Sequence, residues 1–144
     1  MSKKKKTVTL RGLVDDLAMA LQRHVRLKAA VHENKGGYIK CVTCPAWHHW
    51  KDMQGGHWIE RGKQATKLLE ENIWPQCPGC NGFKMKYSTE CRETYSRHMR
   101  DMYGDEQCDE WLRISNLPAN HFRPEIEDEL KRITRLNKEL EAQL

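Results

Sequence analysis

Two pairs of cysteines have the spacing of a zinc-binding site. One pair lies in Cys41-Val42-Thr43-Cys44 and the other in Cys77-Pro78-Gly79-Cys80. Each Cys-x-x-Cys turn presents two sulfurs to one ion, and two such turns complete a tetrahedral four-thiolate shell. The alternatives are a pair of disulfides or four unrelated buried thiols. Because a four-cysteine shell leaves no open coordination position, we expect this zinc to hold the fold and other residues to carry any chemistry.

Three polar residues suited to phosphodiester hydrolysis lie between and just after the cysteine pairs: His57, Asn72 and Asn81. Hydrolysis needs a water that is deprotonated near neutral pH, and imidazole has an unperturbed pKa of about 6.5. It also needs a divalent ion to neutralise charge at the phosphate, and the Asn81 amide oxygen could help to hold one. The spacing fits a strand, a loop, a second strand and a helix. Zinc would then clamp both ends of a small ββα unit.

The order of these motifs resembles the HNH, or ββα-metal, nucleases. More narrowly, the chain resembles the phage recombination endonucleases of the Rap/NinG type. The resemblance is dense from about Gly37 to Tyr103. The matching stretches are Cys41-Val42-Thr43-Cys44, Gly55-Gly56-His57-Trp58-Ile59-x-Arg61-Gly62, Glu71-Asn72-Ile73 and Gln76-Cys77-x-x-Cys80-Asn81.

This resemblance implies a metal-dependent endonuclease that cuts branched recombination intermediates, such as Holliday junctions and displacement loops. DNA would be the partner, and Mg²⁺ or Mn²⁺ the catalytic ion. Carried over by motif position, His57 would be the general base and Asn81 a metal ligand from the helix. Asn72 would orient the base or support the second strand.

One position departs from the wider HNH pattern. Many of these enzymes have an Asp directly before the base histidine as a second metal ligand, whereas this chain has Gly56. We expect Asp52 to supply the second ligand, with Gln54, His48 and His49 as other nearby donors. The missing acid also keeps open a second hypothesis, a zinc-dependent DNA-binding recombination accessory protein that does not cut.

The charge balance suits an anionic partner. The chain of 144 residues has a formal net charge of +5 and a sequence pI near 8.9, which fits nucleic acid without identifying it. The basic run Lys3 to Lys6 is either a solvated tail or a phosphate-contacting arm. The basic residues expected to contact DNA are Lys3, Lys4, Lys5, Lys6, Arg61, Lys63, Lys84 and Lys86.

The predicted fold class is α+β, with a small zinc-stapled ββα-metal (HNH-like) core flanked by N- and C-terminal helices. The predicted divisions are a basic tail (1–9), an N-terminal helix (10–35), the zinc-stapled core (36–104) and a C-terminal helical extension (105–144). The periodicity of apolar residues and the positions of helix-breaking residues predict helices over 10–31, 81–86, 89–103 and 109–114 and from Pro124 onward. Strands are predicted at 38–40, at 59–61 as a continuation from His57, and at 72–74. We expect Trp47, Trp50, Trp58 and Trp74 to form the core of the zinc domain.

The last predicted helix carries an apolar stripe from Ile126 to Leu144. It is expected either to fold onto its own domain or the N-terminal helix, or to form a coiled-coil homodimer. A third hypothesis, a structural zinc protein, would use this helix to bind a protein partner. We find no apolar run of membrane-spanning length and no signal segment, and so expect a cytoplasmic protein with reduced thiols.

Overall fold

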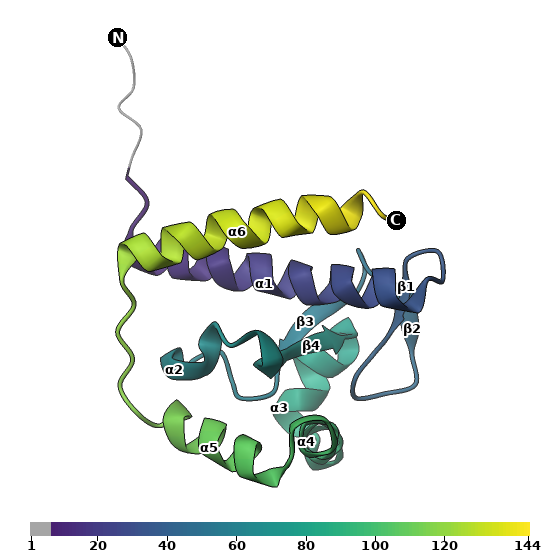
Figure 1. Cartoon of the computed structure of the whole chain (residues 1–144). Coiled ribbons are helices and arrows are strands. Elements are labelled where there is room, and N and C mark those ends of the chain that lie inside the picture. Colours follow the sequence, from purple (N-terminus) through teal and green to yellow (C-terminus); the bar gives the residue numbers. More distant parts are fainter. Residues whose placement is uncertain (1–6) are drawn as a thin grey trace.

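The computed structural model describes residues 7–144 and contains two short antiparallel sheets (Figure 1). Its elements are α1 (Leu10–Glu33), β1 (Tyr38–Lys40), β2 (Trp47–His49), β3 (Gln54–His57), α2 (Gln64–Lys67), the 3₁₀ turn η1 (Glu70–Asn72), β4 (Ile73–Gln76), the π-helical turn η2 (Cys80–Lys84), α3 (Met85–Tyr87), α4 (Thr89–Tyr103), α5 (Asp105–Ser115) and α6 (Arg123–Glu141). Strands β3 and β4 lie among the helices, whereas β1 and β2 lie at one edge, beside the end of α1 (Figure 1). The mixed helix and sheet content agrees with the predicted α+β class. The basic run Lys3 to Lys6 lies outside the described residues.

The first and last helices pack side by side (Figure 1). Thr9 caps α1, its Oγ1 accepting a hydrogen bond from the Gly12 N–H at 3.0 Å. Leu17 and Leu21 of α1 share an apolar cluster with Ile126 and Ile133 of α6. The apolar stripe of α6 is therefore used within the chain, in the first of the two arrangements expected for it. Residues 7–144 contain no helix with the length and apolar character of a membrane span.

A buried polar network fixes how α6 sits on α1. The Nδ1 of His24 lies 2.8 Å from the Asn137 Oδ1, and its Nε2 lies 3.1 Å from the Glu70 carboxylate. The Asn137 amide also donates to the Ala20 carbonyl at 3.1 Å. The hydrogen bond with His24 lowers the pKa of Glu70 to about 2. One histidine thus joins α1, α6 and η1.

The two sheets are each a pair of antiparallel strands. In the first, Ile39 of β1 lies opposite His48 of β2. In the second, Gln54 lies opposite Gln76 and His57 lies opposite Ile73.

The prediction that strand structure continues through 59–61 is wrong, because the Asn72 side chain takes the place of a strand partner there. Its Oδ1 accepts from the Ile59 N–H at 2.8 Å, and its Nδ2 donates to the Ile59 carbonyl at 3.0 Å. The second strand begins at Ile73 rather than Asn72 and runs to Gln76.

Other boundaries also differ from the sequence-based expectation. The predicted helix over 81–86 is a π-helical turn followed by the short α3, whereas α4 spans the predicted 89–103. Helix α5 begins at Asp105 rather than at 109, and Arg100 of α4 forms ion pairs with both Asp105 and Asp109 in its first turns. Of the four tryptophans expected in the core, only Trp50 is buried, and Trp47 is 41% exposed.

Replacing Glu70 by Gln tests the network that joins α1, α6 and η1. Because the pKa of Glu70 is lowered from 4.5 to about 2, its carboxylate stabilises the fold above pH 4.5, and this stabilisation disappears as the pH falls toward about 2. We expect E70Q to cost about 1–2 kcal/mol at neutral pH, since the carboxylate is partly exposed and screened. The difference from wild type should shrink in acid, as measured by urea unfolding over a pH series.

Glu141→Gln is the matched control, because its partner Arg23 and Glu141 itself are both nearly half exposed. This change should cost less than about 0.5 kcal/mol. A Glu70→Gln difference that stays constant down to about pH 3 would contradict the assigned role.

Candidate functional site

The four cysteines meet in one cluster, as their spacing predicts. The Sγ atoms of Cys41, Cys44, Cys77 and Cys80 all lie within 4.8 Å of one another, and those of Cys44 and Cys77 are 3.7 Å apart. Sulfurs about 2.3 Å from a tetrahedral zinc lie about 3.8 Å from each other. All four are free thiols, which excludes the disulfide alternative in this structure. The cluster could therefore hold a structural metal ion.

The two cysteine turns are positioned by the strands that precede them. Cys41 follows β1 directly, and Cys77 follows β4 directly. The Val42 N–H donates to the Pro75 carbonyl at 2.9 Å, which ties the first turn to β4. The Cys77 N–H donates to the Cys41 Sγ at 3.3 Å, a bond that favours the thiolate.

The surroundings shift the pKa values of the cysteine thiols in opposite directions within the cluster. Burial would raise the pKa of Cys41, but hydrogen bonds from Thr43 and from the Cys77 N–H lower it to about 7. Burial raises the pKa of both Cys44 and Cys80. Zinc binds the thiolate form and would keep all four groups deprotonated.

His57 is held as a neutral imidazole with one nitrogen engaged. It ends β3, is 7% exposed, and its Nε2 lies 2.9 Å from the Lys67 carbonyl oxygen. A carbonyl oxygen only accepts, so Nε2 carries a proton, and in the neutral imidazole Nδ1 keeps its lone pair. Nδ1 is buried and has no hydrogen-bond partner within residues 7–144. Burial lowers the pKa of His57, and the charges of Arg61 and Lys67 lower it further.

Asn72 supports the loop that carries this carbonyl. It is fully buried. Besides its two bonds to Ile59, it donates to the Thr66 carbonyl at 3.3 Å, one residue before Lys67. Its side chain thus connects both ends of the loop between β3 and β4. It is placed to support the second strand and to fix the group that orients His57.

Asn81 contacts one of the residues considered as a second metal ligand, Gln54, and not Asp52, which the sequence analysis placed first. Its Nδ2 donates to the Gln54 Oε1 at 2.8 Å. Asp52 is exposed in the turn before β3. Gln54 precedes His57 by three residues, about 10 Å along a strand. The structure therefore joins Asn81 to the start of β3, while His57 lies at the other end.

Gln76 is a site residue that the sequence reasoning did not single out. It is fully buried, its Nε2 donates to the Thr43 Oγ1 at 2.9 Å, and its Oε1 has no partner within the described chain. A Cβ on Gly56 would lie 2.0 Å from this oxygen, so any larger residue there would have to displace the Gln76 side chain. The available signal was its place directly before Cys77 and opposite Gln54 in the hairpin.

The basic residues assigned to DNA contact fall in two places. Arg61 and Lys63 lie in the loop after β3, where Lys63 donates to the Asn116 Oδ1 at 3.0 Å. Lys84 and Lys86 are exposed on η2 and α3, beyond Asn81.

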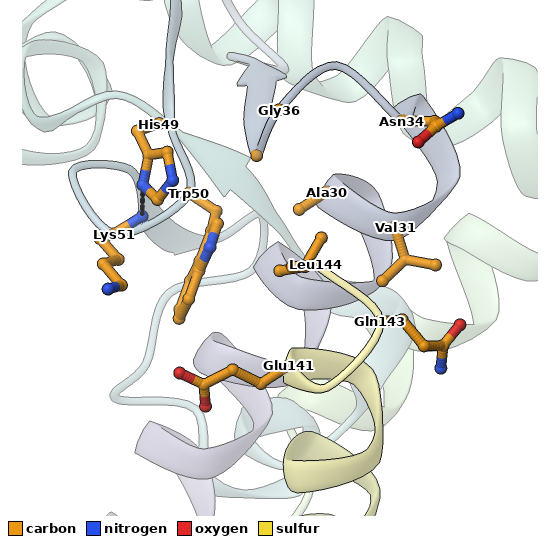
Figure 2. A pocket seen from close by; sticks show the side chains of 11 residues that line it. Ala30, Val31, Asn34, Gly36, His49, Trp50, Lys51, Glu141, Gln143 and Leu144 are labelled. Atoms are coloured by element: carbon orange, nitrogen blue, oxygen red, sulfur yellow. Dashed lines mark hydrogen bonds between the residues drawn. The ribbon is translucent and has the colours of Figure 1, made fainter.

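A pocket of about 440 Å³ lies away from all of these residues. Figure 2 shows His49, Trp50 and Lys51 on one side of it and Glu141, at the end of α6, on the other. The Lys51 N–H donates to the His49 Nδ1 at 3.3 Å. Of the residues named from the sequence, His49, an alternative metal donor, lines this pocket, whereas His57, Asn72, Asn81 and the four cysteines do not. We therefore assign the pocket no part in the chemistry.

No family model, curated protein or solved structure matches this chain. Its functional assignment therefore depends on the residues and their geometry.

Metal analysis tests the cysteine cluster. Wild-type protein should contain about one zinc per chain, and C77S should lose the ion and its cooperative unfolding, because binding and folding are coupled. Cys108→Ser is the matched control: Cys108 is also buried but belongs to a different apolar cluster, so its replacement should leave the zinc in place. A C77S protein that folds normally without metal would contradict the assignment.

Proposed function

We propose that this protein is a metal-dependent endonuclease that hydrolyses phosphodiester bonds in branched DNA, acting on phage recombination intermediates in the host cytoplasm. The observation that carries the proposal is the state of His57, which is neutral, oriented and unpartnered at Nδ1 within the described residues. The β3–β4 hairpin and the helical turn η2 that follows it support the proposal, because their order along the chain is that of a ββα unit.

The chemistry of His57 follows from its two nitrogens. The Lys67 carbonyl fixes the ring and selects the tautomer, as the third member of a catalytic arrangement does. A water that reaches Nδ1 would give its proton to the free lone pair and attack phosphorus. The lowered pKa keeps the imidazole in its basic form at neutral pH. Burial keeps bulk water away until substrate and water enter together.

The residues that would hold a divalent ion are Asn81 and Gln76, through their amide oxygens. The Asn81 Oδ1 is left free when its Nδ2 donates to Gln54, and the buried Gln76 Oε1 is an unused acceptor. Hard cations such as Mg²⁺ and Mn²⁺ prefer oxygen ligands. When bound, the ion would neutralise charge on the phosphate and the leaving oxygen. Because these amides are neutral, affinity for the ion should be weak until the phosphate adds its charge.

The basic residues would hold the DNA backbone. Arg61 and Lys63 follow the strand that ends at His57, and Lys84 and Lys86 follow Asn81, so both flanks of the site carry positive charge. Lys3 to Lys6 would extend this contact.

Two observations favour a second candidate, a DNA-binding recombination accessory protein that does not cut. The position before His57 has no carboxylate, and a side chain there would have to displace Gln76. The His57 side chain is also almost fully covered. Such a protein would keep the zinc frame and the basic flanks while lacking the hydrolytic step.

A nuclease assay separates the two candidates. His57→Ala should cut four-way or flap DNA about 100- to 10,000-fold more slowly in Mg²⁺ or Mn²⁺, the usual contribution of a positioned general base, while zinc content and DNA affinity stay unchanged. His32→Ala, at an exposed histidine near the end of α1, is the matched control and should cut at the wild-type rate. Equal cutting by His57→Ala and wild type would remove this mechanism, and no cutting by wild type on any branched substrate would favour the accessory protein.

Asn81→Ala tests the ion. We expect this variant to need a higher Mg²⁺ or Mn²⁺ concentration for half-maximal cutting, with its maximum rate less affected than in His57→Ala. Brief chelation should stop cutting without unfolding the protein, and added Mg²⁺ should restore it, since the thiolate-bound zinc exchanges slowly compared with an ion on amides. An unchanged metal requirement would assign Asn81 to the strand contact alone.

A further inference from the structure

Two aromatic side chains stand out in water on the helical segment that carries Asn81. Phe83 and Tyr87 are each 66% exposed. Their ring centroids are 5.0 Å apart with planes inclined at 48°. Large aromatic residues are normally buried, so an adjacent exposed pair marks a contact surface.

The backbone that presents this pair is anchored. Between the two rings, Met85 packs inward against the core next to the cysteine cluster. The Arg92 guanidinium donates to the carbonyls of Met85 and Lys86 at 3.1 and 3.2 Å, holding the end of α3. The rings therefore project from a fixed helical segment, so little conformational entropy is lost when a ligand covers them.

The surrounding charge identifies the class of ligand. Residues 81–89 include Lys84 and Lys86 and no acidic residue. The Lys86 Nζ lies 5.7 Å from the Tyr87 ring centroid. Exposed aromatic faces among lysines are how proteins bind single-stranded nucleic acid, with bases stacked on rings and phosphates contacting cations. An apolar protein partner would not call for this uniform positive charge.

The geometry also sets how a base would bind. Stacked bases are about 3.4 Å apart, so a base inserted between two rings needs about twice that separation. The Phe83 and Tyr87 rings already contact each other, and a base would therefore stack on an outer ring face. Tyr87 is six residues from Asn81, no more than about 9 Å along a helix, or about two to three stacked nucleotides.

We propose that Phe83 and Tyr87 form a stacking platform for unpaired bases, flanked by Lys84 and Lys86 for the adjoining phosphates. Binding of a single strand follows from these residues alone. Its role in substrate choice rests on the proposed function: unpaired bases at a branch would seat on the platform and bring the neighbouring phosphate to the site at Asn81. Fully paired duplex offers no free base face and would not use it.

The test measures binding separately from cutting. Fluorescence anisotropy with a labelled single-stranded oligonucleotide and a blunt duplex of the same length, without added divalent ion, gives both affinities for each protein. The double variant F83A/Y87A should bind the single strand at least about 5-fold, and up to about 150-fold, more weakly per stacked base. Its duplex affinity should change less than about twofold. Phe122→Ala, which removes another exposed aromatic just before α6, is the matched control and should bind as wild type does.

Two further variants keep the outcome decisive. F83L/Y87L retains apolar bulk but has no aromatic face, and should bind the single strand as weakly as the alanine variant does. Replacing Lys84 and Lys86 by Gln should lower the slope of log affinity against log salt by about 0.7 for each phosphate that is no longer neutralised, whereas the aromatic variants should leave that slope unchanged. Full single-strand affinity in the leucine variant, or equal weakening on single strand and duplex, would overturn the proposal. If the wild-type protein binds single strands through this platform but cuts no DNA, the stacking platform is supported and the proposed endonuclease activity is rejected.

Discussion

The four-thiolate cluster is the constraint on which the central part of the fold depends. Strands β1 to β4 contain only three or four residues each, and isolated pairs of such strands are not stable in water. The cluster joins the end of β1 to the end of β4 and to the start of η2, so a single ion bound there would connect both sheets to the helical segment. Helices α1 and α6 cover the remaining apolar surface, which lets a chain with a modest core form one ordered unit.

The site at His57 is supported through a sequence of contacts that begins at this cluster. The bond between Val42 and Pro75 holds β4, whose first residue follows Asn72. Asn72 then holds the loop on both sides, at Ile59 and at Thr66. That loop brings the Lys67 carbonyl to the His57 ring. A change at the cysteines would therefore reach His57 through the backbone.

The sequence predicts those parts of this arrangement that depend on local spacing. Two cysteines with two residues between them can direct both sulfurs at one ion, so the cluster could be predicted from the sequence. Helix α4 could also be predicted, from the periodicity of its apolar residues. Contacts between distant residues were not foreseeable. The strand after His57 stops because of Asn72, thirteen residues after Ile59, and any residue larger than glycine at position 56 would have to displace Gln76 across the hairpin. The tryptophans were correct in part as core markers, because Trp50 is buried beside the cysteines and Trp58 and Trp74 pack against the cluster around Tyr95, whereas Trp47 is exposed.

The π-helical turn at Cys80–Lys84 explains how one short segment serves three different purposes. A π turn takes in more residues than an α-helical turn and so changes the direction of the side chains that follow; such turns are frequent at functional sites. Here Cys80 points inward to the thiolate cluster and the next residue, Asn81, reaches Gln54 on β3. Phe83 is then turned out into water. A metal ion at the cluster would fix Cys80, and the turn would then fix the directions of Asn81 and Phe83. Such an ion would orient both the Asn81 amide and the aromatic surface beside it.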